Sequence, residues 1–145
     1  MPFSTTDSPG HFEWPVRVYY EDTDAGGLVY YANFLRFFER ARTEWLRSFG
    51  INQQVLAREF SMMFVVNKAS VDFIAPARLD DELMISAKPV RFGRASVQFE
   101  QLALRKGTLL ASARIKIVSV SLPGMRPVAI PSHVLSRINP QAKDR

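Results

Sequence analysis

The sequence has no cysteine and only two histidines, His11 and His133, which lie near its two ends. Without a thiol, the chain cannot form a disulfide, use a thiolate nucleophile or bind a metal through cysteine. A Ser-His-Asp triad would need one of the two end histidines, and the G-x-S-x-G motif of a serine nucleophile is missing. Carboxylates are therefore the remaining candidates for a nucleophile or a general base, and the lack of cysteine is consistent with the cytoplasm.

Long apolar runs and clusters of one charge are also missing. No stretch of about eighteen apolar residues is present, so we expect no transmembrane helix. The segment MPFSTTDSPGHFEWP lacks the basic and apolar regions of a secretory signal. The formal net charge is +5, but the 19 Lys and Arg residues are scattered along the chain. This distribution favours an anionic small molecule or an acidic protein surface over nucleic acid.

The 145 residues are 47% hydrophobic and indicate one α+β domain. We expect a flexible tail over residues 1–13, a single domain over 14–138 and a second tail over 139–145. Apolar residues at steps of three and four predict a long helix from Asn33 to Phe49, which ends at Gly50. Alternating patterns predict strands over 14–20, 62–74, 82–90, 95–104 and 109–121, with a last short helix over 133–138.

Consecutive hairpins would make the last four of these strands antiparallel neighbours. One helix is too short to cover such a sheet, so we expect a second copy of the chain to cover an exposed edge or face.

Two segments carry a family resemblance. RVYYEDTDAGGLVYYANFLRFFERARTEWL and the later FVVNKASVDFIAPARLDDEL resemble the 4-hydroxybenzoyl-CoA thioesterase family, and most closely its YbgC branch of acyl-CoA thioesterases associated with the Tol-Pal system. The resemblance implies the hotdog fold, in which a five-stranded antiparallel sheet wraps a long central helix. It also implies homodimers or homotetramers that hydrolyse acyl-CoA without a metal or organic cofactor. A cytoplasmic location, free or at the inner membrane, and acyl carrier protein as a partner are further implications.

The resemblance also assigns roles within the segment EDTDAGGLVYYANF. Asp24 matches the catalytic aspartate of the family, which acts as a nucleophile or as a general base. The backbone N–H of Tyr31, at the start of the helix, matches the donor to the thioester oxygen, although relatives of the YbgC branch often have histidine there. Gly27, with Gly26, allows the sharp turn and the close approach of a substrate. A helix N-terminus is a natural site for a developing oxyanion.

Other polar and aromatic residues have more ordinary interpretations. Asp22 is expected to accept hydrogen bonds from nearby backbone N–H groups. A calcium-binding loop is not expected, because the residues after Asp22 and Asp24 do not provide further oxygen ligands at EF-hand spacing. Most helix aromatics should form the core, with Phe34 as the candidate for contact with an acyl group. Arg91 and Arg94 flank the turn at Phe92–Gly93, and the resemblance places them near the phosphates of CoA.

Two functions from different classes follow. The first is an acyl-CoA thioesterase that uses Asp24 and the Tyr31 amide. The second is a hotdog scaffold that binds acyl groups or acyl carrier protein beside phospholipid-synthesis and cell-envelope machinery, with weak hydrolysis. A hydratase or dehydratase is disfavoured because such sites use a histidine, and no histidine falls in the motif.

Overall fold

The computed structural model describes residues 12–139, so most of the tails predicted over 1–13 and 139–145 lies outside that range. Glu13, which was assigned to the first tail, is the first residue of a strand. The described residues form six strands, three α-helices and one 3-10 turn. In chain order these are β1 (Glu13–Arg17), η1 (Tyr20–Asp22), α1 (Asn33–Ser48), α2 (Gln53–Phe60), β2 (Met62–Phe73), β3 (Glu82–Ser86), β4 (Lys88–Phe92), β5 (Ser96–Arg105), β6 (Thr108–Ser121) and α3 (Ser132–Ile138).

All strand pairs in the sheet are antiparallel, and the order is β1-β3-β5-β6-β2, with β4 also paired to β5. The expected α+β class is confirmed. The sheet has six strands because the strand predicted over 82–90 divides at Ala87 into β3 and β4. The prediction of four strands in consecutive hairpins was wrong for the first of them, since β2 pairs with β6 and not with β3.

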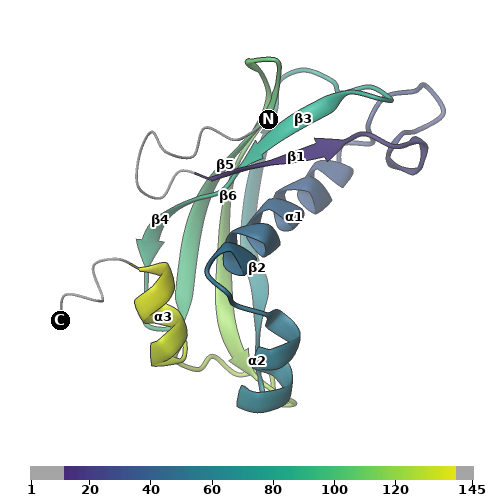
Figure 1. Cartoon of the computed structure of the whole chain (residues 1–145). Coiled ribbons are helices and arrows are strands. Elements are labelled where there is room, and N and C mark those ends of the chain that lie inside the picture. The colour runs from purple at the N-terminus through teal and green to yellow at the C-terminus, as the bar shows by residue number, and fades with distance from the viewer. Residues whose placement is uncertain (1–11, 140–145) are drawn as a thin grey trace.

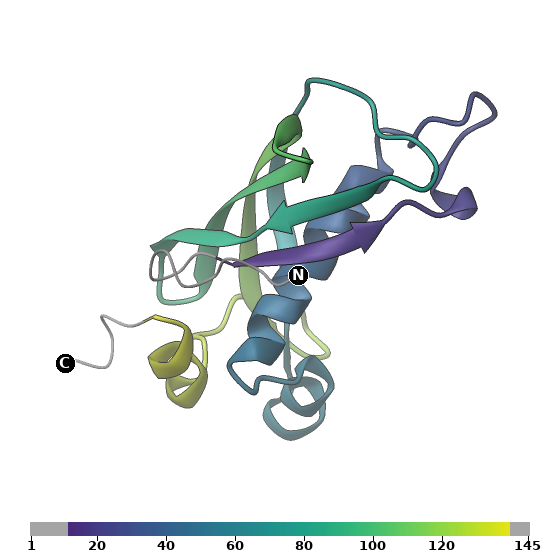
Figure 2. The same cartoon turned by 45° about the horizontal axis from the view of Figure 1, so that its top comes forward.

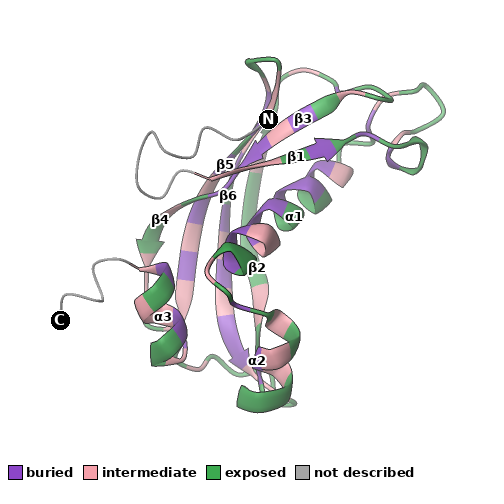
Figure 3. Ribbon diagram, viewed as in Figure 1, coloured by how far each residue is buried: buried purple, intermediate pink, exposed green. Residues whose placement is uncertain are grey.

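Helix α1 lies against one face of the curved sheet, as Figures 1 and 2 show. It begins at the predicted residue and ends at Ser48, one residue before the predicted end, and Gly50 follows with a φ of 77°. The apolar spacing puts one stripe of the helix in the core, and Figure 3 shows this side as buried. The buried apolar residues of the stripe are Phe34, Phe37, Phe38, Ala41, Trp45 and Leu46.

Helix α2 was not predicted from the sequence, although its start has a recognisable cap. The side chain of Asn52 accepts hydrogen bonds from the backbone N–H groups of Gln54 (2.8 Å) and Val55 (3.2 Å). Such a cap satisfies N–H groups that have no partner within a helix. The helix ends at Ser61, which has a left-handed φ of 50° and leads directly into β2.

A buried polar connection joins α1 to the middle of the sheet. The Nη1 group of Arg42 donates to Oε1 of Gln101 on β5 at 2.9 Å. The amide Nε2 of Gln101 donates to the carbonyl oxygens of Phe38 and Ser86, each at 3.0 Å. Gln101 is fully buried and Arg42 is 7% exposed. These bonds fix the register of the helix on the strands, because buried polar groups are costly without partners.

Strand β2 forms one edge of the sheet, and β1 forms the other. The twelve residues of β2 extend for about 40 Å at about 3.3 Å per residue. Much of this edge is exposed, including Val66 and the terminal Phe73. A long unpaired edge readily pairs with another strand. None of the helices in the described range is long and apolar enough to cross a membrane.

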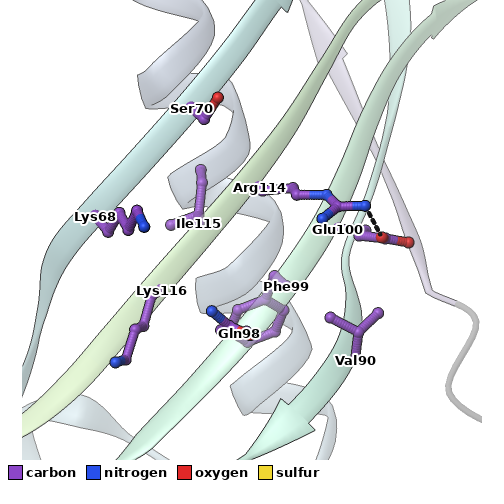
Figure 4. A pocket seen from close by; sticks show the side chains of 9 residues that line it. All are labelled: Lys68, Ser70, Val90, Gln98, Phe99, Glu100, Arg114, Ile115 and Lys116. Atoms are coloured by element: carbon purple, nitrogen blue, oxygen red, sulfur yellow. Dashed lines mark ion pairs between the residues drawn. The ribbon is translucent and has the colours of Figure 1, made fainter.

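The face of the sheet away from α1 is charged. A hollow of about 340 Å³ lies on this face. Figure 4 shows the side chains that line it, which come from several adjacent strands. Lys68 of β2 is paired across the ladder with Lys116 of β6, while Arg114 forms an ion pair with Glu100 at 3.2 Å. Asp24 and Tyr31 do not line this hollow.

Candidate active site

Asp22 anchors the segment that leads from β1 to α1. Its carboxylate is buried and accepts a hydrogen bond from the backbone N–H of Tyr19 at 2.9 Å. Its carbonyl oxygen accepts bonds from the backbone N–H of Tyr30 at 3.2 Å and from the side-chain amide of Asn33 at 2.8 Å. All three contacts are local and structural, as expected for this aspartate.

Asp24 sits in a tight exposed loop that it helps to close. Its backbone N–H donates to the carbonyl of Leu28 at 2.8 Å, and its carbonyl accepts from Gly27 at 3.0 Å. The carboxylate oxygen Oδ1 accepts the N–H groups of Gly26 (2.9 Å) and Leu28 (3.4 Å). Within the described residues, the second oxygen, Oδ2, accepts no hydrogen bond. One carboxylate oxygen is therefore held by the loop, and the other is available for a substrate or a water molecule.

Gly27 is the residue that turns this loop. Its φ of 80° lies in the left-handed region, which residues with a side chain rarely adopt. A Cβ atom built on Gly27 would meet no atom within 4 Å. The glycine is therefore needed for the backbone conformation, and the space beside it is open to a substrate.

The first turn of α1 leaves donors free. The N–H groups of Asn33 and Phe34 donate to the carbonyls of Tyr30 (2.8 Å) and Tyr31 (3.2 Å). The N–H groups of Tyr31 and Ala32 donate to no acceptor in residues 12–139. Ala32 is the N-cap, and its side chain provides no capping hydrogen bond. Asn33 instead bonds back to Asp22 and fixes the loop to the helix.

A group of aromatic rings lies beside these free N–H groups. The ring of Tyr31 is 5.6 Å from that of Phe73, at the end of β2, in an edge-to-face arrangement. The ring of Phe73 is also 5.8 Å from that of Phe34. Tyr31 is 59% exposed and Phe73 is 48% exposed, whereas Phe34 is only 3% exposed. Phe34 is thus buried beside the exposed ring of Phe73. Phe73 is a neighbour of the site that the sequence did not identify.

The neighbouring side chain of Tyr31 raises the pKa of Tyr30 above its ordinary value. The centres of the two rings are 4.8 Å apart, and the rings are tilted by 41° to each other. The two aromatic side chains therefore lie close together just before α1.

The structure does not bring the two predicted phosphate contacts to Asp24 within one chain. Arg91 is exposed on β4, and Arg94 is exposed in the turn that follows it. Figures 1 and 2 both show the end of β4 far from the segment between η1 and α1. A single chain therefore assembles Asp24, Gly27, Tyr31 and Phe34 but leaves the arginines apart.

The arrangement of a long helix on a curved antiparallel sheet, with a carboxylate loop at the helix N-terminus, defines a known class of protein. The chain belongs to the thioesterase-like superfamily, whose family model matches residues 18–138. It is 47% identical to the acyl-CoA thioesterase YbgC of Haemophilus influenzae over 123 residues, which are 85% of this chain and 90% of that protein.

Solved structures show the same hotdog thioesterase fold. A probable thioesterase from Bartonella henselae has a TM-score of 0.80 and 34% identity, and the match covers 83% of this chain and 99% of that one. A 1,4-dihydroxy-2-naphthoyl-CoA thioesterase from Synechocystis has a TM-score of 0.82 and 27% identity, and the match covers 89% of this chain and 96% of that one. The hotdog fold expected from the sequence is thereby confirmed.

Proposed function

We propose that this chain hydrolyses acyl-CoA thioesters, with Asp24 as the catalytic carboxylate and the backbone N–H of Tyr31 as the oxyanion donor. The observation that carries the proposal is the pairing of a carboxylate with one free oxygen and a helix N-terminus with free N–H groups on one short segment. The names of the relatives support the reaction, since YbgC of Haemophilus influenzae is an acyl-CoA thioesterase.

Thioester hydrolysis needs a nucleophile and a stabilised oxyanion. In the general-base route, Asp24 takes a proton from water, and the resulting hydroxide attacks the thioester carbon. The negative charge that develops on the carbonyl oxygen is stabilised by the Tyr31 N–H and the positive end of the α1 dipole. The C–S bond then breaks, and the CoA thiolate takes up the proton. In the nucleophilic route, Asp24 attacks the carbon itself, and the C–S bond breaks to release the CoA thiolate and leave a mixed anhydride. Water then hydrolyses this anhydride, which releases the carboxylic acid, restores the Asp24 carboxylate and supplies the proton to the thiolate.

Other residues are proposed to contact the acyl group and the CoA phosphates. Gly27 leaves the approach to the carboxylate open, and the exposed rings of Tyr31 and Phe73, with Phe34 buried beside Phe73, offer an apolar wall for the acyl group. We assign Arg91 and Arg94 to the phosphates of CoA bound by another copy of the chain, because they lie away from Asp24 in their own chain.

We further propose that the protein works as a homodimer, which can pair again into a homotetramer. The exposed β2 edge supports an edge-to-edge sheet across two copies. Asp24, Tyr31 and Phe73 are all exposed in the single chain, so a second copy would enclose the reaction and exclude water from the acyl wall.

The direct test is steady-state hydrolysis of a panel of acyl-CoAs with short, long and aromatic acyl groups. The rate is measured from the appearance of the free CoA thiol. We expect turnover of at least one member by the purified protein. The alternative function is a cytoplasmic scaffold for acyl groups or acyl carrier protein beside the Tol-Pal machinery of the inner membrane. Binding of the panel without turnover would favour that scaffold and reject the thioesterase.

A further inference from the structure

A second cavity, the β1 cavity, opens between β1, η1 and α1. Its volume is about 330 Å³, which is enough for a small organic molecule. The aromatic and charged groups on its wall come from Trp14, Arg17, Tyr19, Glu21, Asp22 and Arg40. Asp24 and Tyr31 do not line it, so the β1 cavity is separate from the proposed thioester site.

The carboxylate of Asp22 has one oxygen that the fold leaves without a partner. The residue is only 4% exposed, and its Oδ2 accepts the N–H of Tyr19 at 2.9 Å. Within residues 12–139 its Oδ1 accepts no hydrogen bond and forms no ion pair. Oδ1 is not sealed in the core, because Oγ of Ser119 is the only sealed side-chain polar atom without a partner in that range. A nearly buried carboxylate therefore presents an unsatisfied oxygen to the β1 cavity, and such a group ordinarily requires a donor or a cation.

Two further charges on the wall are also unpaired. Glu21 and Arg40 are exposed, and neither forms an ion pair with a residue in the described range. The guanidinium of Arg40 lies 5.7 Å from the centre of the Phe37 ring. Arg17, in contrast, is held 3.7 Å from the carboxylate of Glu82. The β1 cavity therefore has free acidic groups on η1 and a free basic group on α1.

We infer that the β1 cavity binds a small organic amine that carries a separate anionic group, such as 4-aminobutyrate. The ammonium group donates to Oδ1 of Asp22 and is attracted by Glu21. The rings of Trp14 and Tyr19 offer the same cation favourable contacts with their faces. The anionic group binds Arg40, whose planar fork matches a carboxylate.

The arrangement of the charges selects this class of ligand. No ion pair joins Arg40 to Glu21 or Asp22, so a molecule that satisfies both ends must hold its two charges apart. A simple anion would be repelled by the two carboxylates. A metal ion would lack ligands, because the described part of the chain has no group of three His, Cys, Asp or Glu residues that could hold one.

The β1 cavity lies at the edge of the sheet that the proposed dimer leaves uncovered. Arg40 and Arg42 are about 200° apart around α1, at about 3.6 residues per turn. Arg42 lines a cavity with residues of β2 and β6, whereas Arg40 lines the β1 cavity, and β1 and β2 are opposite edges of the sheet. Figures 1 and 2 both show β1 running beside α1. Pro15, in the middle of β1, has no N–H to donate, which disfavours the pairing of another strand with this edge.

The test is an NMR titration of the full chain with 4-aminobutyrate, butylamine and butyrate at constant ionic strength. The chain has only two tryptophans, so their indole N–H signals provide an internal control. Trp14 lines the β1 cavity, whereas Trp45 is 2% exposed in the core. 4-Aminobutyrate should shift the Trp14 signal and leave that of Trp45 in place. Butylamine should bind about twofold to fivefold more weakly, as expected for the loss of one exposed ion pair, and butyrate should not bind.

Substitutions on the wall should separate the two ends of the ligand. Asp22→Asn should weaken the binding of 4-aminobutyrate about tenfold to a hundredfold, because the amide oxygen can still accept from Tyr19 while the NH2 group faces the ammonium. Arg40→Gln should weaken the binding of 4-aminobutyrate and leave that of butylamine unchanged. The matched control is Arg36→Gln, which removes an exposed charge one turn earlier on α1, outside the β1 cavity, and should change neither affinity.

The titration also separates this inference from the proposed reaction. Asp24→Asn should bind 4-aminobutyrate normally, whether or not it still hydrolyses thioesters. No shift of the Trp14 signal, an equal shift with butyrate, or an unchanged affinity in Asp22→Asn would overturn the inference. If Asp22→Asn does not fold, Glu21→Gln decides the question, since it should weaken the binding of butylamine and 4-aminobutyrate alike, and unchanged affinities would contradict the site.

Discussion

Replacing Gln101 by leucine should be among the most damaging polar substitutions in this fold. The change removes three hydrogen bonds in the fully buried centre of the sheet, one from Arg42 and two to carbonyl oxygens. At about 1 kcal/mol for each bond, this loss amounts to about 3 kcal/mol. The guanidinium of Arg42 also loses its only described partner, and stranding a buried charge typically brings the total to about 3–5 kcal/mol.

Urea unfolding followed by circular dichroism measures this cost directly. The matched control is Gln98→Leu, which makes the same chemical change on the same strand but at a half-buried position in the charged hollow of Figure 4. We expect the control to stay within about 0.5 kcal/mol of the wild type. If Gln101→Leu also stays within about 1 kcal/mol, the buried connection does not hold α1 on the sheet, and the reasoning fails.

Three other predictions concern charge and assembly. Burial tends to raise the pKa of Asp81, but hydrogen bonds from the Arg78 N–H and from Arg105 outweigh burial and lower that pKa below its ordinary value. A carboxyl group whose pKa is lower in the folded than in the unfolded chain stabilises the fold at every pH above its unfolded pKa. The wild type should therefore have its full stability advantage over Asp81→Asn at pH 7. In urea unfolding, that advantage should shrink as the pH falls below about 4. Arg91→Ala and Arg94→Ala should raise KM with little change in kcat, since phosphate contacts bind ground and transition states alike; an unchanged KM in both at low salt would remove them from the site. Sedimentation should show a dimer or tetramer at micromolar concentration, and a stable monomer would contradict pairing through β2.

The sequence predicted those elements whose periodicity is uninterrupted. The buried face of α1 was predicted correctly, because apolar residues at steps of three and four lie on one side of a helix. The end of the helix near Gly50 was also correct, because glycine readily adopts the left-handed conformation that follows a helix. The pairing of β2 with β6 was missed because it depends on tertiary packing, and β2 has no local turn that leads into its partner. Helix α2 was missed because it is only eight residues long and lies almost directly before β2.

The candidate site was predictable to a similar extent. The local roles of Asp22, which bonds a backbone N–H, and of Gly27, which turns the chain, could be deduced from residue type and order. The catalytic role of Asp24 came from the family resemblance and stays a prediction. The proximity of Phe73 to Tyr31 arises from the sheet and could not be deduced from spacing. The contacts of Asp81 show the same division between local and tertiary partners. The backbone N–H of Arg78 does bond Asp81, but the ion pair is formed by Arg105, 24 residues further along the chain.

The central claim is that Asp24 is the catalytic acid and Asp22 is not. Asp24→Asn and Asp22→Asn make the same change two residues apart, and kcat for the best acyl-CoA substrate should be measured for both. Losing a general base costs about 10²–10⁴ in rate, so Asp24→Asn should fall by at least that much. Asp22→Asn loses a charge that holds one backbone N–H, and it should remain at least about tenfold more active than Asp24→Asn. Equal kcat values in the two folded variants would contradict the assignment of Asp24.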